Sequence, residues 1–499
     1  MRTAKARKTH RATASASGPA PEVAPVSVPE QAPPKGWLKR ASEAVLDKGA
    51  SASSFLTEEL LRTARASLYL TSHTIEGQFL PVFNSLSEMR QDIETSWLDA
   101  VAGRKSWFNH AQELGDRLVA GSRYQSLVGE LGKQLFGSAV YAGEQVLAKN
   151  DVYRLSYLPP KKGVAVSEAS LFFVAGFIPY GDRLFRFLPE ASLYERYLER
   201  GIPVYLMELV GDRQEMTGLG RVTVERQIDW IDEMAQVAFR HNGERKMVAQ
   251  GYCGSGLQLL SYLAARPRDA DAKFKLATLF VTPVDAKRCN IFAEMVSNMP
   301  RSLLWSAWQR SQLMGGYVRG AEMWAGLDTS LKNVFAKTPM GRFASGWKKP
   351  AWSKVKSVSD LNPLQRFELA GAYWISVDNA ERFPIPVELV RAAIHAYDRG
   401  VGDDGMLGIS YKGRPVTLRS IAEESQLRLT AFYAGQDKLV QEETGHVLMK
   451  LLGPRYRQLT HPTAAHVTYV CFPAQWDKAH PKAFLPNPID VILEDYARA

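Results

Sequence analysis

Apolar and polar positions alternate in a characteristic way after Pro159-Pro160. Short apolar runs there are separated by amphipathic segments, which predicts a mostly parallel sheet with helices on both faces. The runs expected to form strands are 171–175, 204–207, 246–249, 277–281 and 427–433. A crossover helix is expected between the second and third runs, since Ile228, Ile231, Ala235 and Ala238 fall on one helical face. The predicted fold class is α/β.

The rest of the chain follows other patterns. From Trp37 to about Val146, apolar residues recur at spacings of three to five, which predicts an α-helical N-terminal region over 37–146. Residues 1–36 are rich in Ala, Pro, Ser and Lys, so we expect a disordered basic tail. Between about residues 287 and 400 the strand pattern stops, and a helical stretch rich in Trp, Met and Arg intervenes. We expect this stretch to be a cap inserted into an α/β domain of 147–499.

Composition narrows the class of protein. The 499 residues are 45% hydrophobic and 23% charged, as in globular proteins. No apolar run approaches the roughly 18 residues of a membrane span, and no apolar segment follows the basic N-terminus, so we expect a cytoplasmic protein without a transmembrane segment. Three cysteines are too few for a disulfide framework. The net charge of +10 comes without a nucleic-acid-binding motif and could equally attract acidic substrates such as phosphorylated cofactors.

The strongest chemical signal is the turn Gly251-Tyr252-Cys253-Gly254-Ser255-Gly256. It lies between an expected strand and an expected helix, where the nucleophile of an α/β hydrolase occupies a sharp elbow that needs a small residue two positions earlier. Gly251 supplies that residue, and the helix N-terminus favours a thiolate at Cys253. The plain alternative is a buried cysteine packed as a small hydrophobe. Ser255 is a weaker nucleophile candidate, because its flanking positions are Cys253 and Leu257 instead of glycines.

The other members of a catalytic triad follow in the hydrolase order of nucleophile, acid and histidine. Asp437 comes just after an expected strand, and His466 comes 29 residues later. In this arrangement the carboxylate would hold the imidazole, which would take the thiol proton. Asp437 could instead be an ordinary loop residue and His466 a surface histidine. The nearest rivals are His461 for the base and Asp285 for the acid, although a turn or cap role suits Asp285 better.

An oxyanion hole is expected from two backbone N–H groups. One is that of Gly254, and the other follows the first strand, in Gly176-Phe177-Ile178, with Phe177 as the expected donor. No His, Cys and Asp cluster has metal-ligand spacing, and no glycine-rich phosphate loop follows a strand. We therefore expect no metal and no permanently bound cofactor.

The chain resembles the polyhydroxyalkanoate synthases, whose elbow reads Gly-Tyr-Cys-x-Gly-Gly. The resemblance covers roughly residues 145–475, and it lies in Gly251-Tyr252-Cys253, in 149–155, 192–201 and 229–233, in Tyr373-Trp374, in Gly435-x-Asp437 and in Ala465-His466. It implies an α/β-hydrolase fold with a helical cap and a Cys-Asp-His triad of Cys253, Asp437 and His466. The family's paired glycines are Ser255 and Gly256 here, Gly254 stands where a larger residue is common, and no tryptophan-rich ending follows Cys471-Phe472-Pro473.

The resemblance implies an acyltransferase that moves 3-hydroxyacyl groups from coenzyme A thioesters through a Cys253 acyl-enzyme to a growing polyester. Polyhydroxybutyrate depolymerases are relatives that also use cysteine, so a hydrolase or thioesterase is the alternative, and a granule-surface protein with an idle triad is a third. The expected partners are the acyl-CoA substrate, the polyester product and the polyhydroxyalkanoate granule surface. A homodimer or a partner subunit is also conceivable, and the N-terminal helices could dock either one or simply pack on their own chain.

Overall fold

The structure is a computed structural model that describes residues 37–176, 182–209, 218–319, 334–375 and 384–499. Its contacts divide the chain into two compact units, Met1–Thr57 and Glu58–Ala499. The described part of the first unit is the start of helix α1 (Trp37–Thr74). Everything below concerns the second unit.

The N-terminal region is helical, as predicted. Helix α1 continues through a π-helical turn η1 (Ile75–Phe79) into α2 (Leu80–Val101), and α3 (Trp107–Leu127), η2 (Val128–Gly132) and α4 (Lys133–Leu135) follow. Helix α3 begins where the Ser106 hydroxyl accepts a hydrogen bond from the backbone N–H of Asn109, a common N-cap. The helical region ends slightly earlier than expected, because strand β1 already begins at Gln145.

An eight-stranded sheet occupies the centre of the unit, in the order β1-β2-β4-β3-β5-β6-β11-β12. Strand β2 is antiparallel to both of its neighbours, and the pairs from β4 to β12 are parallel. This order, with the second strand reversed, is that of the α/β-hydrolase fold. The strands are β1 (Gln145–Lys149), β2 (Tyr153–Leu158), β3 (Leu171–Val174), β4 (Val204–Leu209), β5 (Met247–Tyr252), β6 (Phe274–Phe280), β11 (Arg428–Ala434) and β12 (Tyr456–His461).

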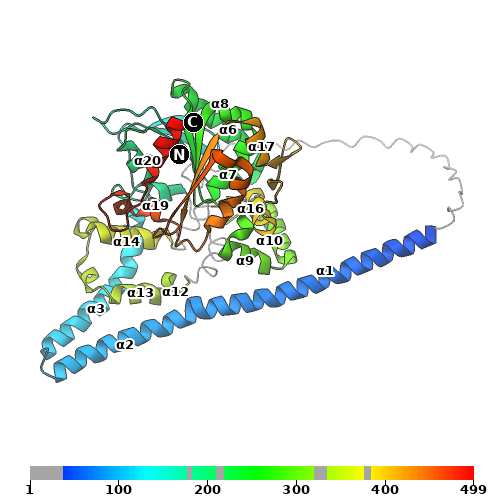
Figure 1. Ribbon diagram of the computed structural model, residues 1–499. Coiled ribbons are helices and arrows are strands. Elements are labelled where there is room, and N and C mark those ends of the chain that lie inside the picture. The colour runs from blue at the N-terminus through cyan, green and yellow to red at the C-terminus, as the bar shows by residue number, and fades with distance from the viewer. Residues whose placement is uncertain (1–36, 177–181, 210–217, 320–333, 376–383) are drawn as a thin grey trace, which may run out of the picture. The chain divides into compact units, whose positions relative to one another are not determined.

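All five predicted strands are present, and their continuous apolar runs are explained by burial on both faces. In β4, Leu206 belongs to one hydrophobic core while its neighbours Tyr205 and Met207 belong to the other, as the alternation of side chains across a strand requires. Helices α6 (Val224–His241), α7 (Gly254–Ala265) and α17 (Arg419–Glu424) lie on one side of the sheet and α20 (Pro488–Arg498) on the other (Figure 1). Strands β1 and β2 were not predicted.

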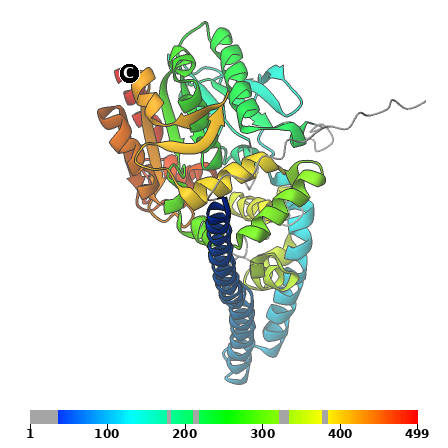
Figure 2. The ribbon, with the colours of Figure 1, turned by 90° about the vertical axis from the view of Figure 1, so that its right-hand side faces the viewer.

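The chain between β6 and β11 is mainly helical. Helix α13 packs against α3 (Figure 2), and a two-residue strand pair joins β7 (Tyr317–Val318) to β8 (Ile385–Pro386). A hairpin of β9 (Met406–Tyr411) and β10 (Arg414–Thr417) precedes α17. The helices are α9 (Asn290–Asn298), α10 (Arg301–Leu313), α12 (Val334–Lys337), α13 (Pro339–Trp347), α14 (Pro363–Trp374) and α16 (Val387–Arg399). That this insertion caps the sheet stays a prediction.

Candidate active site

Cys253 lies in a sharp turn between β5 and α7. Its φ and ψ are 51° and −124°, which is a strained conformation for a residue with a side chain. The N–H of Cys253 donates to the carbonyl of Phe280 in β6 (2.8 Å), and its carbonyl accepts from the N–H of Gly256 (3.0 Å). The backbone is thus held on both sides, and the thiol stands at the N-terminus of α7, partly exposed. Strain of this kind marks the nucleophile elbow of α/β hydrolases.

Two glycines make the turn possible. A Cβ atom on Gly251 would lie 2.6 Å from the Cα of Gly256, and one on Gly256 would lie 2.0 Å from Oγ1 of Thr282. Both distances are far below van der Waals contact, because the strand, the helix and the segment after β6 meet here. Gly251 and Gly256 are therefore fixed by steric contact with the rest of the fold.

Ser255, the weaker nucleophile candidate, is held by the backbone of the turn. It is fully buried, and its hydroxyl accepts from the N–H of Tyr252 (3.0 Å) and donates to the carbonyl of Tyr252 (2.9 Å). The hydroxyl is therefore committed to the backbone just before the elbow. This geometry excludes Ser255 as the nucleophile.

Asp437 and His466 lie together beside the elbow. Nδ1 of His466 is 2.7 Å from Oδ2 of Asp437, whose side chain is completely buried. The other oxygen of Asp437 accepts from the N–H groups of Leu439 (2.7 Å) and Val440 (3.1 Å). Both carboxylate oxygens of Asp437 are thus oriented. Because His466 meets Asp437 through Nδ1, its Nε2 is left to face another partner. The His466 side chain retains 14% exposure.

The electrostatic environment favours the charged form of His466. Burial by itself lowers the pKa of this imidazole, but the charges of Asp437 and Cys253, together with hydrogen bonds to both, raise it well above its usual value. An opposite charge within a few ångströms favours the protonated ring. Asp437 thus holds the imidazole by a hydrogen bond, and Cys253 acts on the same ring from the elbow.

Tyr252 contacts His466, and the sequence had predicted no role for it. Its hydroxyl donates to the backbone carbonyl of His466, and the two rings meet edge to face at 6.1 Å. Burial raises the pKa of Tyr252 well above its usual value, so the phenol stays protonated and remains a donor. Tyr252, the residue next to Cys253, thus fixes the loop that carries His466.

The rival residues have other partners. The ring of His461 is buried, and it contacts the hydroxyl of Tyr469 (2.7 Å) and the carbonyl of Pro486 (2.9 Å), while burial lowers its pKa. Asp285 accepts from Arg288 (2.7 Å) and from the N–H of Val401 (3.0 Å), which fits the turn role expected for it. Cys289 and Cys471 are buried, and burial raises the pKa of both thiols.

The expected oxyanion donors are only partly described. Gly254 is the first residue of α7, so its N–H has no carbonyl one turn earlier to bond. Gly176 has a φ of 132°, and a Cβ there would lie 3.1 Å from the hydroxyl of Tyr153, which explains a glycine directly after β3. Phe177, the expected second donor, and Ile178 lie outside the described residues.

Comparisons with known proteins give structural matches only. No protein-family model matches the chain, and no curated protein sequence matches it significantly. The carboxylesterase CesB from Bacillus subtilis is 10% identical over 71% of this chain and 94% of that chain, with a TM-score of 0.36. An α/β-hydrolase-fold protein from Nakamurella multipartita is 10% identical over 71% and 100%, with a TM-score of 0.34. At these identities the likeness concerns the fold, and nothing about the reaction follows from it.

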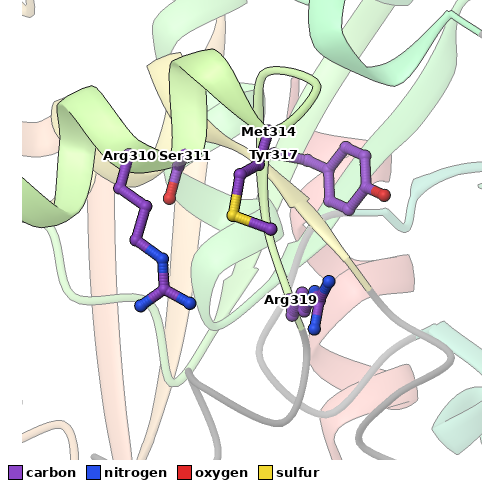
Figure 3. A pocket seen from close by; sticks show the side chains of 5 residues that line it. All are labelled: Arg310, Ser311, Met314, Tyr317 and Arg319. Atoms are coloured by element: carbon purple, nitrogen blue, oxygen red, sulfur yellow. The ribbon is translucent and has the colours of Figure 1, made fainter.

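The described residues contain no group of three or more His, Cys, Asp or Glu side chains placed to hold a metal ion. None of their helices is long and apolar enough to cross a bilayer. A small pocket on α10 and β7, away from the three candidate residues, is lined by Arg310, Ser311, Met314, Tyr317 and Arg319 (Figure 3).

Proposed function

We propose that the protein is an acyl-transfer enzyme in which Cys253 is the nucleophile, His466 the general base and Asp437 the residue that orients His466. The observation that carries this proposal is the hydrogen bond between His466 and Asp437 beside a strained turn that places Cys253 at a helix N-terminus. The influence of Cys253 on the pKa of His466 supports it. Such a nucleophile, base and orienting carboxylate define triad chemistry on many folds.

The reaction would proceed in two transfers. The Cys253 thiolate attacks the carbonyl carbon of a thioester, the bond to the leaving thiol breaks, and the His466 imidazolium gives that thiol its proton. The acceptor then loses its proton to His466 and attacks the acyl-enzyme, and the Cys253 thiolate forms again. The N–H of Gly254 would stabilise the oxyanion in both steps.

The acyl donor we propose is a 3-hydroxyacyl-CoA, with the 3-hydroxyl of a growing polyester as acceptor. This choice rests on the resemblance of the segments around Cys253, Asp437 and His466 to polyhydroxyalkanoate synthases. A thiol nucleophile suits it, because the leaving group is also a thiol and little driving force is lost in each exchange. An enzyme that extends this polyester would act at the surface of a granule in the cytoplasm.

A hydrolase is the second candidate, since water would replace the hydroxyl acceptor with no change in the triad. Ser255 stands where the polyhydroxyalkanoate synthases have the first of two paired glycines. Its hydroxyl is bonded to the backbone of Tyr252, so it favours neither water nor a hydroxyl group as the acyl acceptor. Only the product distinguishes the two reactions.

Incubation of the purified protein with 3-hydroxybutyryl-CoA tests the proposal. We expect release of coenzyme A with formation of polyester, and a covalent 3-hydroxybutyryl adduct on Cys253 in mass spectra of the quenched enzyme. Release of free 3-hydroxybutyrate without polyester would select the hydrolase. Equal turnover by Cys253→Ala would reject both reactions.

Cys289→Ala is the matched control, because it also removes a thiol but one that is buried outside the proposed chain. It should keep the adduct and the turnover. An adduct that disappears with Cys289 and persists in Cys253→Ala would move the nucleophile to Cys289.

A further inference from the structure

The long N-terminal helix bears large apolar side chains on its exposed face. Within the second unit these residues, called here the apolar stripe, are between 41% and 72% exposed. The stripe consists of Leu61, Leu68, Ile75, Phe79, Phe83, Leu86, Ile93, Trp97 and Val101. The backbone remains helical through η1, since Thr74, Phe79 and Leu80 all have α-helical φ and ψ. The helix is therefore continuous from α1 to α2, and the apolar stripe follows it.

The opposite face of the same helix is already used by the protein itself. Its buried positions in η1 and α2 are small or polar: Gly77, Ser85, Ser96 and Ala100. This is the reverse of an ordinary surface helix, which turns its large apolar residues inward. The packing of one chain thus explains the inner face and leaves the apolar stripe unexplained.

Polar contacts fix which way the helix faces. The carboxylate of Glu59 accepts from the N–H groups of Arg301 (2.9 Å) and Ser302 (3.1 Å) at the start of α10. One turn later, Arg62 donates to the carbonyls of Ser297 and Met299 (both 3.4 Å) at the end of α9. An anion at a helix N-terminus and a cation at a helix C-terminus are both favourable. The contacts of Glu59 and Arg62 therefore oppose a rotation of the helix about its axis that would bury the apolar stripe.

The N-terminal tail is a poor cover for this surface. Residues 1–36 contain only Val23, Val26 and Val28 as large apolar residues after Met1. Three valines in a proline-rich segment cannot bury nine large side chains spread over 41 residues of helix, which is roughly 60 Å long.

The spacing of the stripe indicates a helix as its partner. Successive members are separated by seven, seven, four, four, three, seven, four and four residues. Spacings of three, four and seven keep the members on one face of a helix, as in coiled coils, with two runs of four and four that depart from a strict heptad. We propose that the apolar stripe is a dimer interface, in which it packs against the same stripe of a second copy in antiparallel orientation.

A two-fold axis near Pro81 brings every member opposite another large side chain. Phe79 then faces Phe83 of the second copy. In the same register Ile75 faces Leu86, Leu68 faces Ile93 and Leu61 faces Val101. Trp97 faces Arg65, which gives a cation–π contact. An isologous interface needs this kind of self-complementarity.

The area that the interface would bury and the charge of α2 both support a second copy of the chain as the partner. At on the order of 100 Å² for each large side chain, the stripe would bury roughly 900 Å² per copy, close to the 800 Å² per partner of a standard interface. Helix α2 has the acidic residues Glu88, Asp92, Glu94 and Asp99 against one basic residue, Arg90. Helices that bind anionic bilayers have basic flanks instead.

Sedimentation equilibrium of the full-length protein at tens of micromolar tests the proposal. We expect a dimer for the wild type and a monomer for Phe83→Glu, because a charge is placed at the centre of the interface. Asn84→Glu is the matched control: Asn84 is exposed but outside the stripe, and this variant should remain a dimer. Unchanged far-UV circular dichroism would show that each variant is folded, and Ile75→Glu provides a second disrupting variant.

The orientation has a test of its own in a Cys253→Ala background. The register places Ser72 opposite Arg90 of the second copy. A mixture of Ser72→Cys and Arg90→Cys chains should therefore be joined by a short bismaleimide more than either chain alone. Preferential linkage of Ser72→Cys to itself would overturn the antiparallel arrangement.

Other results would reject the interface as a whole. A monomeric wild type, or a dimer that persists in both Phe83→Glu and Ile75→Glu, would do so. Binding of a monomeric wild type to neutral phosphatidylcholine vesicles would assign the stripe to an apolar surface instead. None of these results depends on whether the acyl-transfer proposal holds.

Discussion

Nδ1 of His466 lies 2.7 Å from Oδ2 of Asp437, and the second oxygen of Asp437 accepts from the N–H groups of Leu439 and Val440. The carboxylate therefore has one orientation, and it fixes the tautomer and direction of the imidazole. For Asp437→Asn we expect kcat to fall by roughly 10³–10⁴-fold. The amide can keep both backbone contacts, but it offers an N–H where the imidazole needs an acceptor. Steady-state release of coenzyme A measures the effect.

Asp285→Asn is the control for that substitution. Asp285 also follows a strand end, but it bonds Arg288 and the N–H of Val401. We expect its kcat to stay within a few-fold of wild type. A larger loss in Asp285→Asn than in Asp437→Asn would exchange the two roles.

The charge state of His466 is open to direct measurement. Burial lowers the pKa of His466, and the stronger effects of Asp437 and Cys253 raise it well above its usual value. In NMR titrations we expect the ring to stay protonated above pH 7 in the wild type. Its pKa should move down in Cys253→Ala and in Asp437→Asn, because each substitution removes one of the two groups that raise it. An unchanged pKa in both variants would contradict these interactions.

The same shift makes a prediction for stability. A histidine whose pKa is higher in the folded state contributes stability below its unfolded pKa, and this contribution disappears as pH rises through the folded pKa. The wild type should therefore exceed Asp437→Asn in melting temperature most near pH 6, in the usual range of protonated histidine. Thermal unfolding followed across pH 5 to 10 measures the difference, and a gap that widens with rising pH would have the wrong sign.

Gly256 provides a test of the elbow's packing. A Cβ there would lie 2.0 Å from Oγ1 and 2.7 Å from Cγ2 of Thr282, so Gly256→Ala should lower the free energy of unfolding by about 2 kcal/mol or more. Thr282→Ala removes both of those atoms and should recover part of the loss when the two are combined. Denaturant unfolding of the single and double variants gives the coupling, and purely additive effects would contradict the contact.

Arg186 holds a buried ion network at the edge of the sheet. It bonds Glu144 through two nitrogens (2.7 and 2.9 Å) and Glu208 through two (both 2.9 Å), and Glu208 is buried. Arg186→Ala would leave these carboxylates without their shared cation, at a cost of roughly 3–5 kcal/mol. The exposed Arg104, paired with Asp99, is the control, and Arg104→Ala should change stability by less than about 1 kcal/mol. Similar losses in both would indicate that burial is not the cause.

The sequence by itself determined the type of most elements. The strands around residues 171, 204, 247, 277 and 428 were predicted because strands buried on both faces must be continuously apolar. The crossover helix was predicted because Ile228, Ile231, Ala235 and Ala238 must share one buried face. The candidates Cys253, Asp437 and His466 were found by their order and by their positions after expected strands. Such signals are local, so they can be found without knowing the path of the chain.

The tertiary structure decided what depends on distant parts of the chain. His466 and not His461 meets Asp437, because β12 ends at His461, whose ring is held by Tyr469 and Pro486. Gly256 is required because Thr282 packs against it, and the hydroxyl of Ser255 turns toward Tyr252 instead of the site. The outward direction of Phe79 and Phe83 was also invisible in the sequence, since periodicity defines a face of a helix but not which face the rest of the fold will cover.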